Sequence, residues 1–258
     1  MQFTRRTGLK LAAALMGSAF IPSLAMGQDT MTEYTHSTGA GDIVIHPVSH
    51  ASMVWQTPAG VIYVDPVGGA EAYADLPAPD LILITHEHGD HYDQPTLDAL
   101  AQVPLITNKA VFDMLPDAMQ GRATAMANGD TGKILEFDIE AIPAYNITED
   151  RLQYHPKGRD NGYVLTIGDM RFLIAGDTED TPELRALTDI AVAFLPMNLP
   201  YTMTVQQAAD AVTEFAPKVV YPYHFRDSDV QEFATLVKDS GTATEVVIAN
   251  WYPDGMDG

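Results

Sequence analysis

Short apolar runs separated by turns fill most of the chain, and their spacing predicts many strands and few helices. In the first half such runs lie at 43–45, 52–55 and 61–64, and Pro58-Ala59-Gly60 favours a tight turn between the last two. The run Leu81-Ile82-Leu83-Ile84 is apolar throughout, which is typical of a strand buried on both faces. These patterns predict four early strands.

The second half repeats this alternation of apolar runs and turns. Gly168-Asp169 marks one of the turns, between two runs that each have the length of a strand. The pattern predicts strands at 139–143, 163–167, 171–175, 191–195, 219–221 and 246–249.

Four helices are predicted between these strands. Asp93-Gln94-Pro95 opens the first, because proline is well tolerated in the first turn of a helix. Two more are expected at 109–115 and 229–239. The segment 205–216 has the clearest pattern, with Thr204 and Gln207 spaced as a capping box. Because strands dominate each half and helices follow them, the sequence predicts an α+β fold of two face-to-face sheets with helices outside.

Residues 1–27 are predicted to be a signal peptide of the twin-arginine type. The pair Arg5-Arg6 precedes an apolar stretch at 11–24, and small residues suited to cleavage follow it. The stretch is short and interrupted, so a stable membrane anchor is not expected. We therefore expect a periplasmic protein with a loose segment at 28–41 and one domain at 42–258.

The composition limits the partners and the metal ligands that the protein can have. There are 35 acidic and 14 basic residues, a net charge of −21, and such a surface repels nucleic acid. The chain has no cysteine, so it has neither a disulfide nor a thiolate ligand. A bound metal would be held by imidazole and carboxylate groups, which favours zinc, manganese or iron. Composition leaves the oligomeric state open.

The most informative motif is Thr85-His86-Glu87-His88-Gly89-Asp90-His91, directly after the buried strand. His86 and His88 alternate and can face the same way, while Asp90 and His91 turn towards a second point. Three histidines and an aspartate at this spacing are typical of a hydrolase metal site. The alternative is a polar loop that holds histidines by chance.

Two further candidate ligands follow strands in the same manner. Asp177 comes after the strand at 171–175, and His224 comes after the strand at 219–221. Loops that leave the carboxyl ends of strands converge at one edge of a sheet. Asp177 can bridge two cations through its two oxygens, and His224 can complete a second site.

One ligand of the first site is still needed, and His155 is the best remaining candidate. His36 lies in the segment expected to be loose, and His46 and His50 flank an early strand. A lone histidine is more often a satisfied polar group, so the choice of His155 depends on the site lacking a ligand.

With these residues the chain resembles the metallo-β-lactamase superfamily. The detail is similar to the branch that contains L-ascorbate-6-phosphate lactonase and the N-acylphosphatidylethanolamine phospholipase-D-like hydrolases. In that branch an element like His50-Ala51-Ser52 precedes the first strand pair, although Ser49 here replaces a glycine. The motifs in family order are Tyr63-Val64-Asp65-Pro66, 85–91, Ala175-Gly176-Asp177-Thr178, Leu195-Pro196-Met197 with Thr202-Met203, and Pro222-Tyr223-His224-Phe225.

The resemblance implies a four-layer αββα sandwich of two mixed β-sheets with helices outside, and a binuclear centre. It assigns one metal to His86, His88 and His155, and the other to Asp90, His91 and His224, with Asp177 between them. Asp65 would orient a ligand histidine, although a turn-forming Asp-Pro pair is an equal interpretation.

Such a centre would act as a metal-dependent hydrolase. Two divalent ions, zinc before manganese or iron, lower the pKa of a shared water, so that a metal-bound hydroxide attacks a small ester, lactone or phosphodiester. Asp90 and Asp177 would be the catalytic carboxylates. The alternatives are a β-lactamase, a mononuclear iron sulfur dioxygenase and a non-catalytic metal-binding protein.

The expected partner is a small anionic or ester-like substrate, because two cations leave the centre locally positive. Lys157, Arg159 and Arg226 lie beside the candidate ligands in sequence and can bind a phosphate or carboxylate, unless they are solvated surface charges. The residues that could line a pocket are Tyr145, Asn146, Asn161, Asn198 and Tyr201.

Overall fold

The computed structural model describes residues 32–253 and residue 255. The predicted signal peptide at 1–27 therefore lies outside the described residues, as do residues 28–31. No helix in the described part of the chain is long and apolar enough to cross a membrane.

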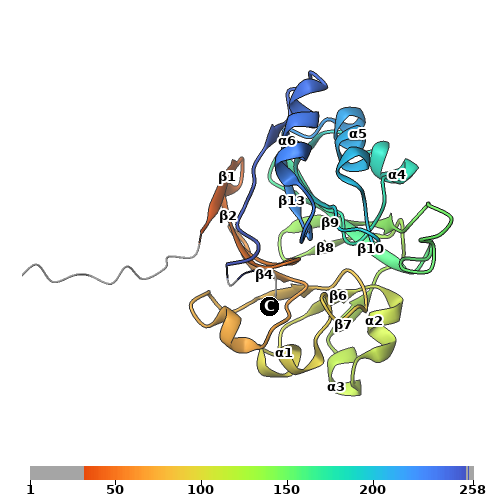
Figure 1. Ribbon diagram of the computed structural model, residues 1–258. Coiled ribbons are helices and arrows are strands. Elements are labelled where there is room, and N and C mark those ends of the chain that lie inside the picture. The colour runs from red at the N-terminus through yellow and green to blue at the C-terminus, as the bar shows by residue number, and fades with distance from the viewer. Residues whose placement is uncertain (1–31, 254, 256–258) are drawn as a thin grey trace, which may run out of the picture. The chain divides into compact units, whose positions relative to one another are not determined.

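Two seven-stranded sheets pack face to face in the described region (Figure 1). The first contains, in spatial order, β1 (Tyr34–Thr38), β2 (Gly41–Ser49), β3 (Ser52–Thr57), β4 (Gly60–Val64), β5 (Leu81–Leu83), β6 (Leu105–Thr107) and β7 (Ala123–Ala125). The second contains β8 (Thr131–Ile134), β9 (Phe137–Ala144), β10 (Asp160–Ile167), β11 (Met170–Ile174), β12 (Ile190–Pro196), β13 (Val219–Tyr223) and β14 (Glu245–Val246).

Both sheets are mixed and share one topology. Antiparallel pairs join β1 through β4, and parallel pairs join β4 through β7. In the second sheet β8 through β11 are antiparallel and β11 through β14 are parallel. The predicted sandwich of two mixed sheets is confirmed.

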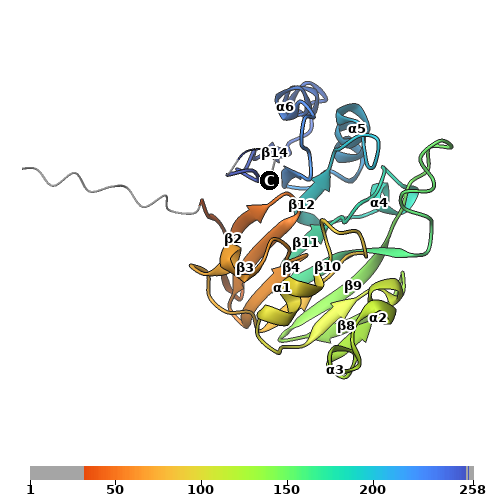
Figure 2. The same ribbon diagram turned by 60° about the horizontal axis from the view of Figure 1, so that its bottom comes forward.

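Helices cover the outer faces of both sheets. The two views place α4, α5 and α6 beside the second sheet and α1, α2 and α3 beside the first (Figures 1 and 2). Their bounds are α1 Gln94–Ala99, α2 Lys109–Met114, α3 Asp117–Gln120, α4 Pro182–Arg185, α5 Val205–Phe215 and α6 Val230–Asp239, with a 3₁₀ turn at Ala70–Tyr73. The predicted capping box of α5 is present, because Thr204 and Gln207 each bond the other's backbone N–H.

Two apolar layers hold the sandwich together. On β3, Trp55 belongs to the core between the sheets and contacts Phe172 and Phe194 of the second sheet, with ring centroids 5.6 Å apart in both cases. Val54, on the opposite face of β3, belongs to the layer beneath α1 and α2. β5, within the strand predicted at 81–84, divides its side chains between the same two layers, so it is buried on both faces.

Two expectations for local structure are wrong. The segment expected to be loose contains β1, which pairs antiparallel with β2. β1 is an edge strand whose side chains alternate between half-buried and exposed, so its residues lack the apolar run of an inner strand. The strand expected at 246–249 is confined to Glu245–Val246. The short strands β6, β7 and β8 were not predicted.

Candidate metal centre

The loops that carry Asp65, the segment 85–91, Asp177 and His224 leave the carboxyl ends of parallel strands: β4 and β5 are neighbours, and β11 and β13 flank β12. Asp65 follows β4, and the segment 85–91 follows β5 in the first sheet. Asp177 follows β11, and His224 follows β13 in the second sheet. The parallel pairs in each sheet bring these carboxyl ends together.

The backbone is strained where these loops turn inward. His50, Asp65 and His224 have φ values of 51°, 44° and 48°, and each such residue costs about 1–3 kcal/mol. Gly176 has a φ of 65°, and a Cβ there would lie 2.7 Å from the Asn161 carbonyl oxygen. Only glycine fits this turn, which directs the next residue towards the histidines.

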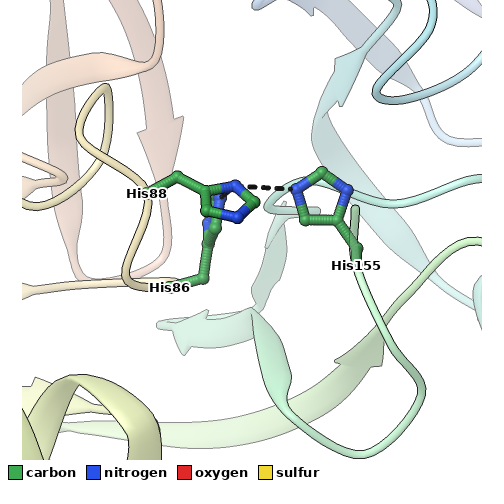
Figure 3. Close-up of side chains that lie close together, drawn as sticks. All are labelled: His86, His88 and His155. Atoms are coloured by element: carbon green, nitrogen blue, oxygen red, sulfur yellow. Dashed lines mark hydrogen bonds between the residues drawn. The ribbon is translucent and has the colours of Figure 1, made fainter. Parts of the chain in front are cut away.

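Three of the predicted ligands form a compact group, shown in Figure 3. His86 Nε2 lies 3.1 Å from His88 Nδ1, which lies 3.2 Å from His155 Nε2. Around a tetrahedral ion with bonds of about 2.0–2.1 Å, ligand nitrogens are about 3.3 Å apart. The three nitrogens therefore have the spacing of ligands to one cation, and His155 comes from a loop 67 residues or more away from the other two.

Asp177 lies between this group and a second set of histidines. Its Oδ2 is 3.4 Å from His155 Nε2 and 3.9 Å from His86 Nε2. The same oxygen is 3.3 Å from His224 Nε2, and Oδ1 is 3.3 Å from His91 Nε2. One carboxylate thus faces imidazoles on both sides.

Asp90 completes the second set. Its Oδ2 lies 3.4 Å from His224 Nε2, and its side chain is 39% exposed, whereas the side chains of Asp177 and His224 are almost fully buried. Asp90 is thus the carboxylate of the cluster that faces solvent.

Hydrogen bonds behind the cluster fix the histidine tautomers. Asp65 is fully buried and accepts the Nδ1–H of His91 at 2.8 Å and the Thr85 hydroxyl at 2.7 Å. Since the Thr85 proton is given to Asp65, its oxygen accepts the Nδ1–H of His86 at 3.0 Å. The Nδ1–H of His155 is donated to the Tyr201 carbonyl at 3.1 Å. His86 and His155 therefore present unprotonated Nε2 atoms to the centre, whereas His91 Nε2 faces the carboxylate of Asp177.

Sequence reasoning missed His50, which lies in this cluster. Its Nε2 is 3.3 Å from Asp90 Oδ2, and its ring lies 3.8 Å from that of His224. The Tyr252 hydroxyl accepts the backbone N–H groups of Phe225 and Arg226, at 3.1 and 2.8 Å, so its own proton is directed to His50 Nδ1 at 2.8 Å.

This arrangement puts the His50 proton on Nε2, facing Asp90. His50 therefore differs from His86 and His155, since it presents a donor and not a lone pair. Its Nδ1 bonds Tyr252, and its buried Nε2 lies beside Asp90 with no closer hydrogen-bond partner. This position suits a residue that orients Asp90, and His50, Asp90 and His224 also have the spacing of ligands to one cation. The His50-Ala51-Ser52 element was the available signal, but nothing in the sequence alone connects it to Asp90.

Burial sets the protonation of the three-histidine group. It lowers the pKa of His88, lowers that of His86 well below the usual value, and lowers the pKa of His155 to about 4. The same effect lowers the pKa of His50 to about 4. These imidazoles are neutral at pH 7, the state that binds a metal.

In the second set, which contains His91 and Asp177, neighbouring charges outweigh the effect of burial on the pKa values. Burial opposes charge on His91, but the carboxylates of Asp177 and Asp65 outweigh it and raise the His91 pKa well above its usual value. Burial alone would raise the pKa of Asp177, yet His224 and His91 hold it well below the ordinary range. A cation bound here would replace the proton on His91 Nε2 as the partner of Asp177, while the Nδ1–H stays bonded to Asp65.

The donor set fits divalent cations. Among the described residues, His91 Nε2, Asp177 Oδ1 and both ring nitrogens of His224 are buried without a hydrogen-bond partner. Such atoms are costly to bury unless something binds them. Imidazole and carboxylate donors, without thiolate, suit zinc, manganese or iron.

Of the residues expected to line a pocket, the structure brings two to the centre. Asn198 and Tyr201 line a cavity that also contains His88, Asp90 and His224. The other three, Tyr145, Asn146 and Asn161, do not line this cavity. Their side chains are buried and hydrogen-bonded to other residues of the protein. The two remaining histidines have structural partners, namely His36 with Tyr221 and His46 with Gln56.

Comparison with known proteins gives the family. A sequence model described as the beta-lactamase superfamily domain matches residues 44–224. The chain belongs to the metallo-β-lactamase superfamily.

Individual relatives agree with this placement. A UPF0173 metal-dependent hydrolase of Pyrococcus furiosus is 29% identical over 194 residues, covering 71% of this chain and 84% of the relative. A crystal structure of a candidate metal-dependent hydrolase from Parabacteroides distasonis is 41% identical, with a TM-score of 0.76 over 85% of this chain and 99% of that one. A metallo hydrolase from Ignicoccus hospitalis shares the fold, with 22% identity, a TM-score of 0.66, and coverage of 80% and 94%.

The chain is accordingly a metal-dependent hydrolase of the metallo-β-lactamase superfamily, with candidate histidine and aspartate metal sites. The likeness to the lactonase and phospholipase-D-like branch stays a resemblance in sequence motifs.

Proposed function

We propose that the protein is a binuclear metal-dependent hydrolase that cleaves a small ester, lactone or phosphodiester. The observation that carries the proposal is the position of Asp177, whose carboxylate faces His86 and His155 on one side and His91 and His224 on the other. A carboxylate between two sets of imidazoles is suited to bridging two ions. A mononuclear iron dioxygenase would leave the second set without a role.

Two divalent ions, with zinc as the first candidate, would supply Lewis acidity and a water of lowered pKa. Asp90 faces the cavity and is held by His50 and His224, so its carboxylate can accept a hydrogen bond from the attacking water and orient it. Burial opposes charge on Asp90, but these two histidines hold its pKa well below the usual value. It is therefore a better orienting group than a proton carrier.

Substrate class and location belong to the same proposal. The resemblance to the lactonase and phospholipase-D-like branch favours an ester, lactone or phosphodiester over a β-lactam. The motif in residues 1–27 favours export to the periplasm and removal of that segment.

Turnover assays test the proposal directly. The protein, stripped of metal and reloaded with zinc, manganese or iron(II), is tested on bis(4-nitrophenyl) phosphate, 4-nitrophenyl acetate and γ-butyrolactone, with a β-lactam for comparison. We expect hydrolysis of at least one of the first three that rises with metal up to two equivalents. Activity that saturates at one equivalent would contradict the binuclear centre, and β-lactam turnover alone would replace the substrate class.

His224→Ala should lower bound zinc from about two ions per chain to about one. The substitution removes the imidazole that faces both Asp90 and Asp177, so the second set loses a donor while the three-histidine group remains. Metal analysis after gel filtration measures the change. His36→Ala is the matched control, because His36 contacts Tyr221 and lies in β1. Two ions retained by the His224 variant would remove this residue from the metal site.

His50→Ala should keep two zinc ions per chain at saturating zinc and still lose about 10- to 100-fold in kcat. The reason is that His50 presents an N–H to Asp90 and orients it without binding metal. His50→Gln, which restores a side-chain N–H donor, should recover part of the loss. Loss of one ion from the alanine variant would instead make His50 a ligand.

A further inference from the structure

A cavity of about 700 Å³ opens over the metal centre. Asp90, Asp177 and His224 line it, together with Tyr201 and Arg226. A second hollow of about 510 Å³ reaches Asp90 from the side of His50, and Arg226 lines this one as well. Arg226 therefore stands where the two hollows meet, beside the carboxylate that faces solvent.

The backbone holds Arg226 in this place at a cost. Its φ is 39°, in the left-handed region that favours glycine, and the Tyr252 hydroxyl accepts its N–H at 2.8 Å. The same hydroxyl accepts the N–H of Phe225, so the turn after His224 is fixed at two successive residues. A strained position occupied by a long cationic side chain beside an active centre indicates a role for that side chain.

The other two cations that the sequence placed beside the centre are neutralised. Lys157 Nζ is 2.9 Å from Glu183 Oε1. Arg159 lies 2.8 Å from Glu87 and 2.7 Å from Asp160. By contrast, the guanidinium of Arg226 has neither an ion pair nor a hydrogen bond with any described residue, and Arg226 is exposed.

We propose that Arg226 binds an anionic group of the substrate, a carboxylate or a phosphate, that is distinct from the bond being cleaved. This inference rests on the proposed hydrolase function and names its substrate class. A guanidinium binds such groups through two parallel hydrogen bonds. The chain has a net charge of −21, so most of its surface repels anions. A cation at the cavity that no carboxylate neutralises would attract an anionic group to this one place.

Binding of matched product analogues tests the proposal. Succinate, glutarate and adipate carry one carboxylate for the metal centre and a second at a different reach, whereas their monomethyl esters carry only one. Calorimetric titration of the zinc-loaded protein gives the ratio of the two dissociation constants at each length. We expect at least one diacid to bind about tenfold or more tightly than its monoester, because hydrogen bonds to charged groups contribute on this scale.

Substitutions at and near Arg226 test whether its side chain causes the preference for diacids over monoesters. Arg226→Gln should bring the ratio to about one, and Arg226→Lys should keep part of it because the charge remains while the paired hydrogen bonds are lost. Asp227→Asn, which removes the carboxylate next to Arg226 in the cavity wall, should leave the preference intact or strengthen it. Lys109→Gln is the control, since Lys109 pairs with Asp113 on exposed α2 and should leave the ratio unchanged.

Three results would overturn the inference: no diacid preference at any length in the native protein, a preference that survives Arg226→Gln, or no binding of any analogue. The outcome is separable from that of the proposed function. If the protein hydrolyses nothing but its preference for diacids depends on Arg226, the proposed hydrolase function is refuted and the anion site stands. If it hydrolyses a substrate but shows no preference for diacids, the hydrolase function stands and the anion site is refuted.

Discussion

Asp177→Asn is expected to reduce kcat/KM on the order of a thousandfold and to weaken zinc binding at both halves of the centre. The amide keeps the shape of the carboxylate but removes the charge that faces His91, His155 and His224. Removal of a single well-placed polar group at a reacting centre can cost about 10²–10³ in rate, and loss of a bridging ligand adds to that. Steady-state kinetics and zinc titration of the metal-free variant measure the two effects.

Two comparisons make this result specific. Asp113→Asn removes a carboxylate of the exposed pair with Lys109 and should change neither the kinetics nor the metal content. Circular dichroism of the Asp177 variant should match that of the native protein. A variant that retains two tightly bound ions and near-native turnover would show that Asp177 is not the bridging group.

Trp55→Ala is expected to destabilise the fold by about 3–5 kcal/mol. Trp55 is fully buried between the sheets and contacts Phe172 and Phe194, so its loss opens a cavity across the interface of the sandwich. Urea unfolding of the metal-free protein measures the change, because bound metal would add its own stabilisation to the native state.

Trp55→Phe is the matched variant. It keeps an aromatic ring and removes the indole N–H, which has no hydrogen-bond partner among the described residues, so its cost should be clearly smaller than that of alanine. Equal stability of the alanine variant and the native protein would contradict the packing of the two sheets at this position.

The inner strands of the fold could be predicted from the sequence because their burial is visible in their composition. Leu81–Leu83 is apolar on both faces, and both faces are covered. β1 could not be found in this way, since an edge strand with exposed side chains carries a polar sequence. β6 and β7 have three residues each, too few for a periodic pattern.

In the candidate site, too, some residues could be predicted from the sequence and others could not. His86, His88 and His91 are neighbours in sequence, so their spacing alone brings them together, and Asp177 and His224 follow recognisable strands. His50 depends on contacts between distant segments: its backbone carbonyl accepts the N–H of His224, and its ring is held by Tyr252. No local pattern records such contacts.

The sequence could not show which of the three cations beside the ligands is free to bind an anion, because this depends on contacts between distant segments. Lys157, Arg159 and Arg226 are equivalent as positions beside candidate ligands. Their ion-pair partners distinguish them, and Glu183 and Glu87 are distant in sequence from the cations they neutralise.

The number of metal ions per chain tests the central claim most directly. The metal-free protein is titrated with zinc, and the bound metal is counted by native mass spectrometry and elemental analysis. Two tightly bound ions, with one lost in His224→Ala and two retained in His50→Ala, are the predicted result. Saturation at a single ion in the native protein would contradict a binuclear centre built around Asp177.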